Sequence, residues 1–202
     1  MTDPTQLPPA AVLVSHPVAD FDTWKKGFDD HESDRRDDAA ALAHHINRAE
    51  DDPNMVTTFI ATSDIDKAKA FTASDDLREI MQEVGVTGPP EFTWVTPRRE
   101  DVIWDRELPA FLLSHRVADF DKWLEGYDGA DDLRTSRGII GHAANQSIDD
   151  PSVAIVYHQA ESFEDLRAFL ADPELKTIME NAGVTSEPDV TFHTGGHGKM
   201  YV

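Results

Sequence analysis

The stretch Ser15-His16-Pro17-Val18-Ala19-Asp20-Phe21-Asp22-Thr23-Trp24 returns 99 positions later, with two substitutions, as Ser114-His115-Arg116-Val117-Ala118-Asp119-Phe120-Asp121-Lys122-Trp123. Outside this decamer the matches continue. After a one-residue slip placed within 30–35 they have a spacing of 98, as in Arg36 with Arg134, His44 with His142 and Gly85 with Gly183. A repeat of about 100 residues is a duplicated domain, not a short solenoid unit.

The repeat divides the chain into parts. We expect a first repeat at 11–96, a linker at 97–109, a second repeat at 110–195 and a C-terminal tail at 196–202. Residues 1–10, with three prolines, are expected to be a disordered lead-in.

Each copy predicts the order β-α-β-β-α-β. The first helix begins after Asp20, whose carboxylate suits an N-cap, and carries Phe21, Trp24 and Phe28 on one face. The acidic stretch 29–38 is expected to be the solvated end of that helix. The second helix begins after Asp64 and restarts near Ser74. Apolar or β-branched runs predict strands at 11–18, 42–48, 55–61 and 91–95.

This order is that of the split βαβ, or ferredoxin-like, unit, in which two helices cover one face of a four-stranded sheet. A domain of this size is marginally stable alone, so we expect the two bare sheet faces to pack together. The predicted fold class is α+β: two tandem ferredoxin-like repeats packed sheet to sheet as an intramolecular pseudo-dimeric α/β barrel. A monomer is the simplest expectation.

Three motifs carry a family resemblance: His16-x-Val-x-Asp-Phe-Asp-x-Trp24 with its second copy, the later Asp-Asp-Pro, and Leu77-x-x-x-Met81-x-x-x-Gly-Val. Together they resemble the dimeric α/β-barrel superfamily, near antibiotic-biosynthesis-monooxygenase-like proteins and small proteins labelled cyclases. The resemblance covers nearly the whole chain. It implies that one chain forms the barrel that relatives build from two subunits.

Charge is the strongest compositional signal. Eighteen Lys and Arg against 39 Asp and Glu give a net charge of −21, which disfavours binding to a phosphate backbone. One interpretation is adaptation to a high-salt cytoplasm, where salt screens self-repulsion; the alternative is an ordinary acidic protein. Cysteine is absent, which excludes disulfides and thiolate metal sites. No long apolar run predicts a membrane span, and no leader is recognised, so a soluble, cytoplasmic protein is expected.

The candidate catalytic residues are polar side chains on predicted strands: His16, His115, His44, His142, Asn47 and Asn145. Histidine can act as a base or a hydrogen-bond donor near neutral pH. The alternative is that His16 and His115 only bond to neighbouring groups at a strand end. Strand alternation puts His44 and Asn47 on opposite faces of one strand, and the same holds for His142 and Asn145. Either the two histidines or the two asparagines can therefore line an interior cavity, but not both pairs. Candidate walls of a substrate pocket are Phe92, Trp94, His158 and His193.

Three functions stay open. The first is a cofactor-independent monooxygenase or cyclase acting on an aromatic or polyketide-like molecule inside the barrel, where histidine and asparagine donors would stabilise an enolate or phenolate. The second is a non-enzymatic ligand-binding or stress-related protein. The third, a haem-associated protein, rests on the resemblance alone. No cofactor or metal site is expected. The adjacent His44 and His45 cannot readily bind one ion together, because neighbouring residues of a strand point to opposite faces.

Overall fold

The computed structural model describes residues 7–201, so most of the predicted lead-in lies outside the described residues. Eight strands form one closed barrel in the order β1-β3-β2-β8-β5-β7-β6-β4. Their bounds are β1 Ala10–Pro17, β2 Ala41–Ala49, β3 Met55–Thr62, β4 Glu91–Asp101, β5 Leu108–Arg116, β6 Ile139–Ser147, β7 Val153–Ala160 and β8 Asp189–Met200.

Helices follow the first and third strands of each repeat as pairs. They are α1 Phe21–Asp30, α2 Glu32–Asp37, α3 Ile65–Thr72 and α4 Asp75–Glu83 in the first half, and α5 Phe120–Gly129, α6 Asp131–Ser136, α7 Phe163–Leu170 and α8 Pro173–Asn181 in the second. The decamer contains the start of α1 and α5, where the Asp20 and Asp119 carboxylates accept hydrogen bonds from the backbone N–H of Thr23 and Lys122. Among the described residues, no helix is long and apolar enough to cross a membrane.

The barrel closes by strand pairing between the halves. Each half has the ferredoxin-like order, β4-β1-β3-β2 and β8-β5-β7-β6, and antiparallel ladders β2–β8 and β4–β6 join them. The predicted α+β class and ferredoxin-like pseudo-dimer are confirmed. The contact between halves includes hydrogen-bonded strand edges as well as facing sheets. β4 extends to Asp101, within the stretch 97–109, and β8 extends to Met200, within the stretch 196–202.

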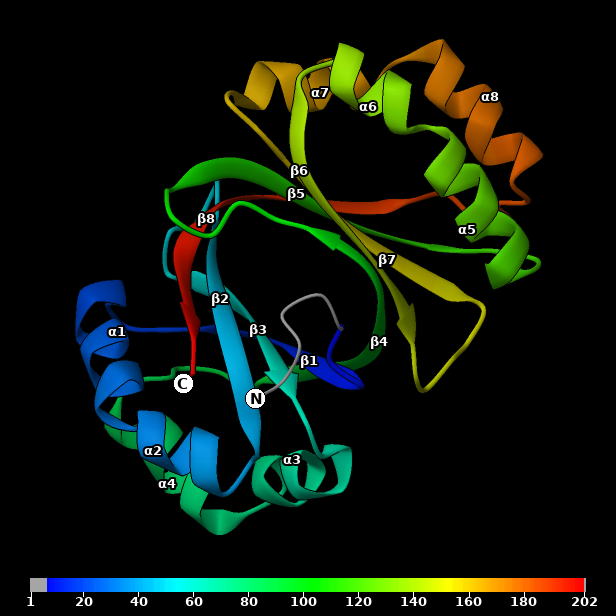
Figure 1. The fold of residues 1–202 in the computed structure, drawn as a ribbon. Coiled ribbons are helices and arrows are strands. Elements are labelled where there is room, and N and C mark those ends of the chain that lie inside the picture. The colour runs from blue at the N-terminus through cyan, green and yellow to red at the C-terminus, as the bar shows by residue number, and fades with distance from the viewer. Residues whose placement is uncertain (1–6, 202) are drawn as a thin grey trace.

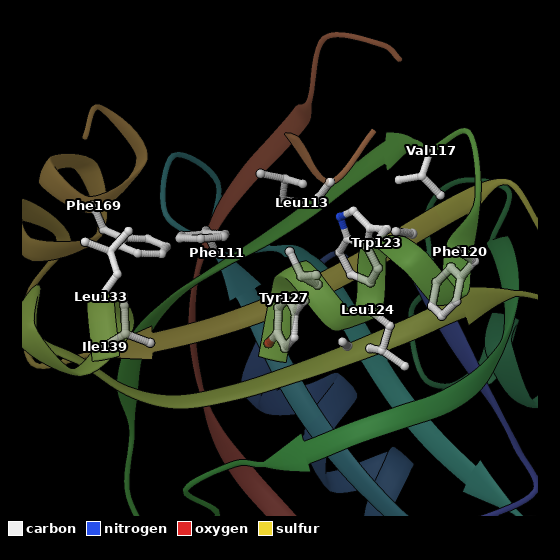
Figure 2. Packing of buried hydrophobic residues seen from close by; sticks show 14 of the residues in the cluster. Phe111, Leu113, Val117, Phe120, Trp123, Leu124, Tyr127, Leu133, Ile139 and Phe169 are labelled. Carbon is white, nitrogen blue, oxygen red and sulfur yellow. The ribbon is translucent and has the colours of Figure 1, made fainter. Parts of the chain in front are cut away.

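Strand alternation separates an inner surface from an outer one. The helices of each half cover the outside, and Figure 1 shows the two helical layers on opposite sides of the central barrel. The second-half core lies between sheet and helices, where Phe111 and Leu113 of β5 meet Phe120, Trp123 and Tyr127 of α5 (Figure 2). Two chemically different kinds of space result: one kind lies between helices and sheet, once in each half, and the other lies inside the barrel.

The acidic stretch after α1 was predicted incorrectly. It forms the short helix α2 and buries Arg35, whose guanidinium lies 3.5 Å from the centroid of the Phe28 ring. Arg134 lies over Tyr127 in the same way, at 4.3 Å. The counterpart of Arg134 is therefore Arg35, not Arg36. The spacing of 99 persists through this helix, and the slip falls in the turn that leads to β2.

Candidate functional site

An apolar cavity of about 80 Å³ lies between the helices and the outer face of the first-half sheet. The side chains of β1 that point to the helices line it, together with the aromatic rings of α1 and the apolar stripe of α4; among them are Val14, His16, Trp24, Phe28, Ile80 and Phe92. A groove of about 510 Å³ along α4 shares Thr72, Leu77, Met81 and Phe92 with the cavity. The groove therefore adjoins the cavity along α4.

The cavity wall includes a buried cation. The Arg35 side chain is 6% exposed, its Nε donates to the Tyr201 hydroxyl at 3.2 Å, and its Nη2 is buried without a hydrogen-bond partner. Within residues 7–201 this guanidinium forms no ion pair with a carboxylate. Burying an uncompensated charge is costly, and an anion supplied by a ligand would offset that cost.

Two neutral histidines accompany Arg35. Burial lowers the pKa of His16 to about 4, and its ring stands edge-on to Trp24 at 5.5 Å between centroids. Burial, with a smaller contribution from the charge of Arg35, lowers the pKa of His44 to about 3. Its Nδ1 lies 2.7 Å from the Tyr201 hydroxyl. That hydroxyl, which receives a hydrogen bond from Arg35, can donate its own proton to His44. Neutral imidazoles can accept a proton from a bound acid.

The second half repeats this arrangement with its charge compensated. Its cavity is about 50 Å³ and is lined by His115, Trp123 and Arg134, among others. Arg134 donates to the Tyr127 carbonyl at 2.6 Å and pairs with Asp131 at 3.2 Å, although its Nε, like Nη2 of Arg35, is buried without a hydrogen-bond partner. An anion is therefore required less here than beside Arg35.

The inside of the barrel is lined by the strand residues that alternate with those facing the helices. An open cavity of about 740 Å³ reaches Ser15, Thr57, Ser114 and His193. It shares Leu13, Thr57, Leu112 and His193 with a narrower chamber that also touches His45, Asn47, Trp104, Asn145 and Tyr157. The two spaces therefore adjoin inside the barrel, the narrow chamber measures about 40 Å³, and together they are called the lumen.

The predicted site residues divide between these spaces. The histidines His16, His115, His44, His142 and His158 all lie on the helix side of the sheet, as do Phe92 and Trp94. They do not meet inside the barrel, where a substrate was expected, because the alternation of β1, β2 and their counterparts points them outward. Asn47, Asn145 and His193 face the lumen. On β2 and β6 it is therefore the asparagine pair, and not the pair His44 and His142, that lines the interior. No three or more His, Asp or Glu side chains in the described part of the chain are grouped to hold a metal ion.

Sequence reasoning missed four residues in these spaces: Arg35, Tyr201, His45 and Tyr157. Arg35 sits in a charged segment with no apolar periodicity, and Tyr201 reaches His44 from the far end of the chain. A signal did exist for His45 and Tyr157, because their repeat counterparts, Ala143 and Phe59, are apolar.

The chain thus has the fold of ferredoxin-fold proteins related to antibiotic biosynthesis monooxygenases, in tandem form. No protein-family model matches the chain, and no curated protein matches it. Solved structures do match. An anthrone oxidase-like protein is 13% identical with a TM-score of 0.71, and the match covers 95% of this chain and 92% of the other.

Two further structures show the same fold. A candidate monooxygenase from Lactobacillus acidophilus NCFM is 12% identical with a TM-score of 0.65 over 96% of both chains. An uncharacterised ferredoxin-fold protein related to antibiotic biosynthesis monooxygenases, from Listeria monocytogenes 4b F2365, is 8% identical with a TM-score of 0.53 over 93% and 94% of the chains. At these identities the likeness establishes the fold, and the function has to be argued from the site.

Proposed function

We propose that the chain binds a small aromatic molecule as its anion across the first-half cavity and the adjoining groove along α4, which measure about 80 and 510 Å³, and oxygenates it without a cofactor. The observation that carries this proposal is the buried Arg35 guanidinium, which has an unpartnered Nη2 in an otherwise apolar, aromatic-walled cavity. Such a site favours a planar apolar body with one anionic oxygen. The names of the structural neighbours, a candidate monooxygenase and an anthrone oxidase-like protein, agree with this class of reaction.

The chemistry needs a base and a stabilised anion. His16 accepts the proton from a CH₂ group that is activated by a neighbouring phenol or carbonyl, and Arg35 stabilises the resulting enolate. Its pKa of about 4 makes His16 a weak base in the empty cavity, and the negative charge of the enolate would raise that pKa in the complex. The carbanion then combines with dioxygen, and the peroxide anion takes the proton back from His16 to give a hydroperoxide. Loss of water from the hydroperoxide converts CH₂ to C=O, so one oxygen atom enters the product and the other leaves as water.

The test uses 1,8-dihydroxyanthrone, with oxygen consumption and quinone absorbance measured against the rate without protein. Arg35→Met should reduce kcat/KM by at least tenfold, because it removes the charge and keeps an apolar stem. Arg134→Met is the matched control, since its guanidinium is compensated by Asp131, and it should change kcat/KM by less than threefold.

Binding and turnover must be measured separately. Suppose that the protein binds 2-naphthoate, that Arg35→Met abolishes this binding, and that no oxygen is consumed with 1,8-dihydroxyanthrone. This combination would support a non-enzymatic ligand-binding protein and contradict the oxygenase. Equal losses in the two arginine variants would contradict the location of the site.

We further propose that the protein acts as a monomer, since strand edges of its two halves already close the barrel. Light scattering in high salt should give the mass of one chain, 22.5 kDa. A mass near twice that value would contradict the proposal.

A further inference from the structure

The barrel lumen contains a hydrogen-bond network assembled from both halves. The Tyr157 hydroxyl on β7 donates to Asn47 Oδ1 on β2 at 2.8 Å, and Asn47 Nδ2 lies 3.2 Å from His45 Nδ1. Because Nδ1 accepts this hydrogen bond, the His45 proton is on Nε2. That Nε2 is buried and has no partner among the described residues.

A second imidazole lies where the wide cavity meets the narrow chamber. His193 is 4% exposed and lines both spaces. Its Nε2 lies 2.8 Å from the Thr191 hydroxyl, while its Nδ1 is buried without a partner. Burial lowers the pKa of both His45 and His193 to about 4, so both rings are neutral near pH 7. Unpartnered buried polar atoms are costly, and of the nine side-chain atoms of this kind in the described residues only these two lie on the lumen side of the sheet.

The fold itself does not require this polar group. The repeat gives His45, Tyr157 and His193 an apolar counterpart each in the other half. The counterparts are Ala143 for His45, Phe59 for Tyr157, and Val95 for His193. Of His45, Asn47, Tyr157 and His193, only Asn47 has a polar counterpart, Asn145, and each asparagine donates to a carbonyl of the neighbouring strand. The duplicated scaffold therefore carries one polar constellation per chain, not two.

Gly195 makes room for that constellation. A Cβ atom at this position would stand 2.0 Å from Asn47 Oδ1 and 2.6 Å from the Tyr157 hydroxyl. The counterpart of Gly195 is Pro97, which pairs with Asn145. Glycine is thus required on the side of the barrel where the hydroxyl and amide meet.

The lining and the entrance define the ligand class. Apolar walls from Leu13, Leu112, Phe59 and Trp104 suit an aromatic ring. The wide end carries the carboxylates Glu50, Asp51, Asp52, Glu91 and Asp189, which disfavour an anion. A carbonyl oxygen can accept a hydrogen bond from an imidazole N–H. We propose that the barrel lumen is a second, single-copy binding site for a small uncharged aromatic molecule that carries a carbonyl oxygen.

The probe is 2-acetylnaphthalene, measured by titration calorimetry on the full chain, with 2-naphthoate as the anionic comparison. We expect one molecule of the neutral probe per chain. His193→Val and His45→Ala should each weaken its binding by up to about tenfold, the effect of one hydrogen bond. Each variant installs the counterpart residue that the other half already contains, so folding should be retained and is checked by circular dichroism.

The two sites are separated by a crossed comparison. Arg35→Met should leave binding of the neutral probe unchanged, while His193→Val and His45→Ala should leave 2-naphthoate unchanged. Failure of 2-naphthoate to bind would contradict the helix-side site and leave the lumen proposal intact. The lumen proposal is overturned by any of three results: no binding of 2-acetylnaphthalene, two molecules per chain, or binding that both histidine variants leave unaltered.

Discussion

Replacing Arg35 with methionine should stabilise the unliganded protein, although the residue is buried and makes contacts. The favourable contributions are the Phe28 ring at 3.5 Å and the hydrogen bond to Tyr201 at 3.2 Å. A desolvated cation–π contact is worth about 2 kcal/mol and a hydrogen bond from a charged donor about 1.5–3 kcal/mol. Against them stand a desolvation cost of several kcal/mol for an unpaired ion and about 1–3 kcal/mol for the unpartnered Nη2.

The balance favours removal of the charge. Methionine retains much of the apolar stem packing and leaves no buried polar atom at the position. We expect the free energy of unfolding to rise by about 1–2 kcal/mol and the Tm by about 2–8 °C, at about 2–4 °C per kcal/mol for a chain of this length. Arg134→Met should lower the free energy of unfolding by about 1 kcal/mol, because the bonds of this guanidinium to Asp131 and the Tyr127 carbonyl outweigh the cost of its unpartnered Nε.

Urea unfolding at fixed salt, followed by circular dichroism, measures both changes. A loss of stability in Arg35→Met as large as that in Arg134→Met would refute the reasoning. It would mean that the first-half guanidinium is already compensated and does not need an anionic ligand. A stabilised Arg35→Met that no longer binds 2-naphthoate would show that stability has been exchanged for function.

Three further predictions concern the whole chain. Ala40 has a left-handed φ of 50°, and its counterpart Gly138 has a φ of 81°. In urea unfolding, Ala40→Gly should therefore stabilise the protein by about 0.5–1 kcal/mol and Gly138→Ala should destabilise it by about 1–2 kcal/mol. Changes of the same sign in the two variants would contradict left-handed backbone at both positions. Burial holds the folded-state pKa of His16, His45 and His193 at about 4, below the unfolded value of 6.5. Their stabilising contribution, up to roughly 3 kcal/mol each, is therefore complete above pH 6.5 and is lost as the pH falls toward 4. Urea midpoints that do not fall between pH 7 and pH 5 would count against it. The net charge of −21 predicts a Tm that rises between dilute buffer and molar KCl, and a flat response in differential scanning calorimetry would remove the argument for halophilic adaptation.

The fold could be predicted because its signals are local and repeated. The Asp20 cap, the aromatic stripe of α1 and the alternation of β1 each appear twice, and each specifies one element with its buried face. The pairing of the two sheets then followed from their bare faces.

The site could be predicted only in part, because alternation gives two faces without saying which one faces the helices. His16 and Asn47 were both recognised as candidates, yet they lie on opposite sides of the sheet. The contact between Asn47 and Tyr157 spans 110 residues, and the burial of Arg35 depends on an aromatic ring beneath a polar helix. Neither leaves a periodic pattern in the sequence.

Fusion of the two halves explains how equivalent positions, both beside the helices and in the lumen, can carry different side chains in the two halves. In a symmetric homodimer, any substitution in the lumen occurs twice, so His45 and Tyr157 would appear with their symmetry mates, and Ala143 and Phe59 could not stand opposite them. The tandem chain removes that constraint. One half has a paired guanidinium while the other leaves Arg35 uncompensated, and one side of the lumen is polar while the other is apolar. Reverting the lumen residues to their counterparts should therefore restore pseudo-symmetry at little cost to folding, since the scaffold already tolerates that arrangement once.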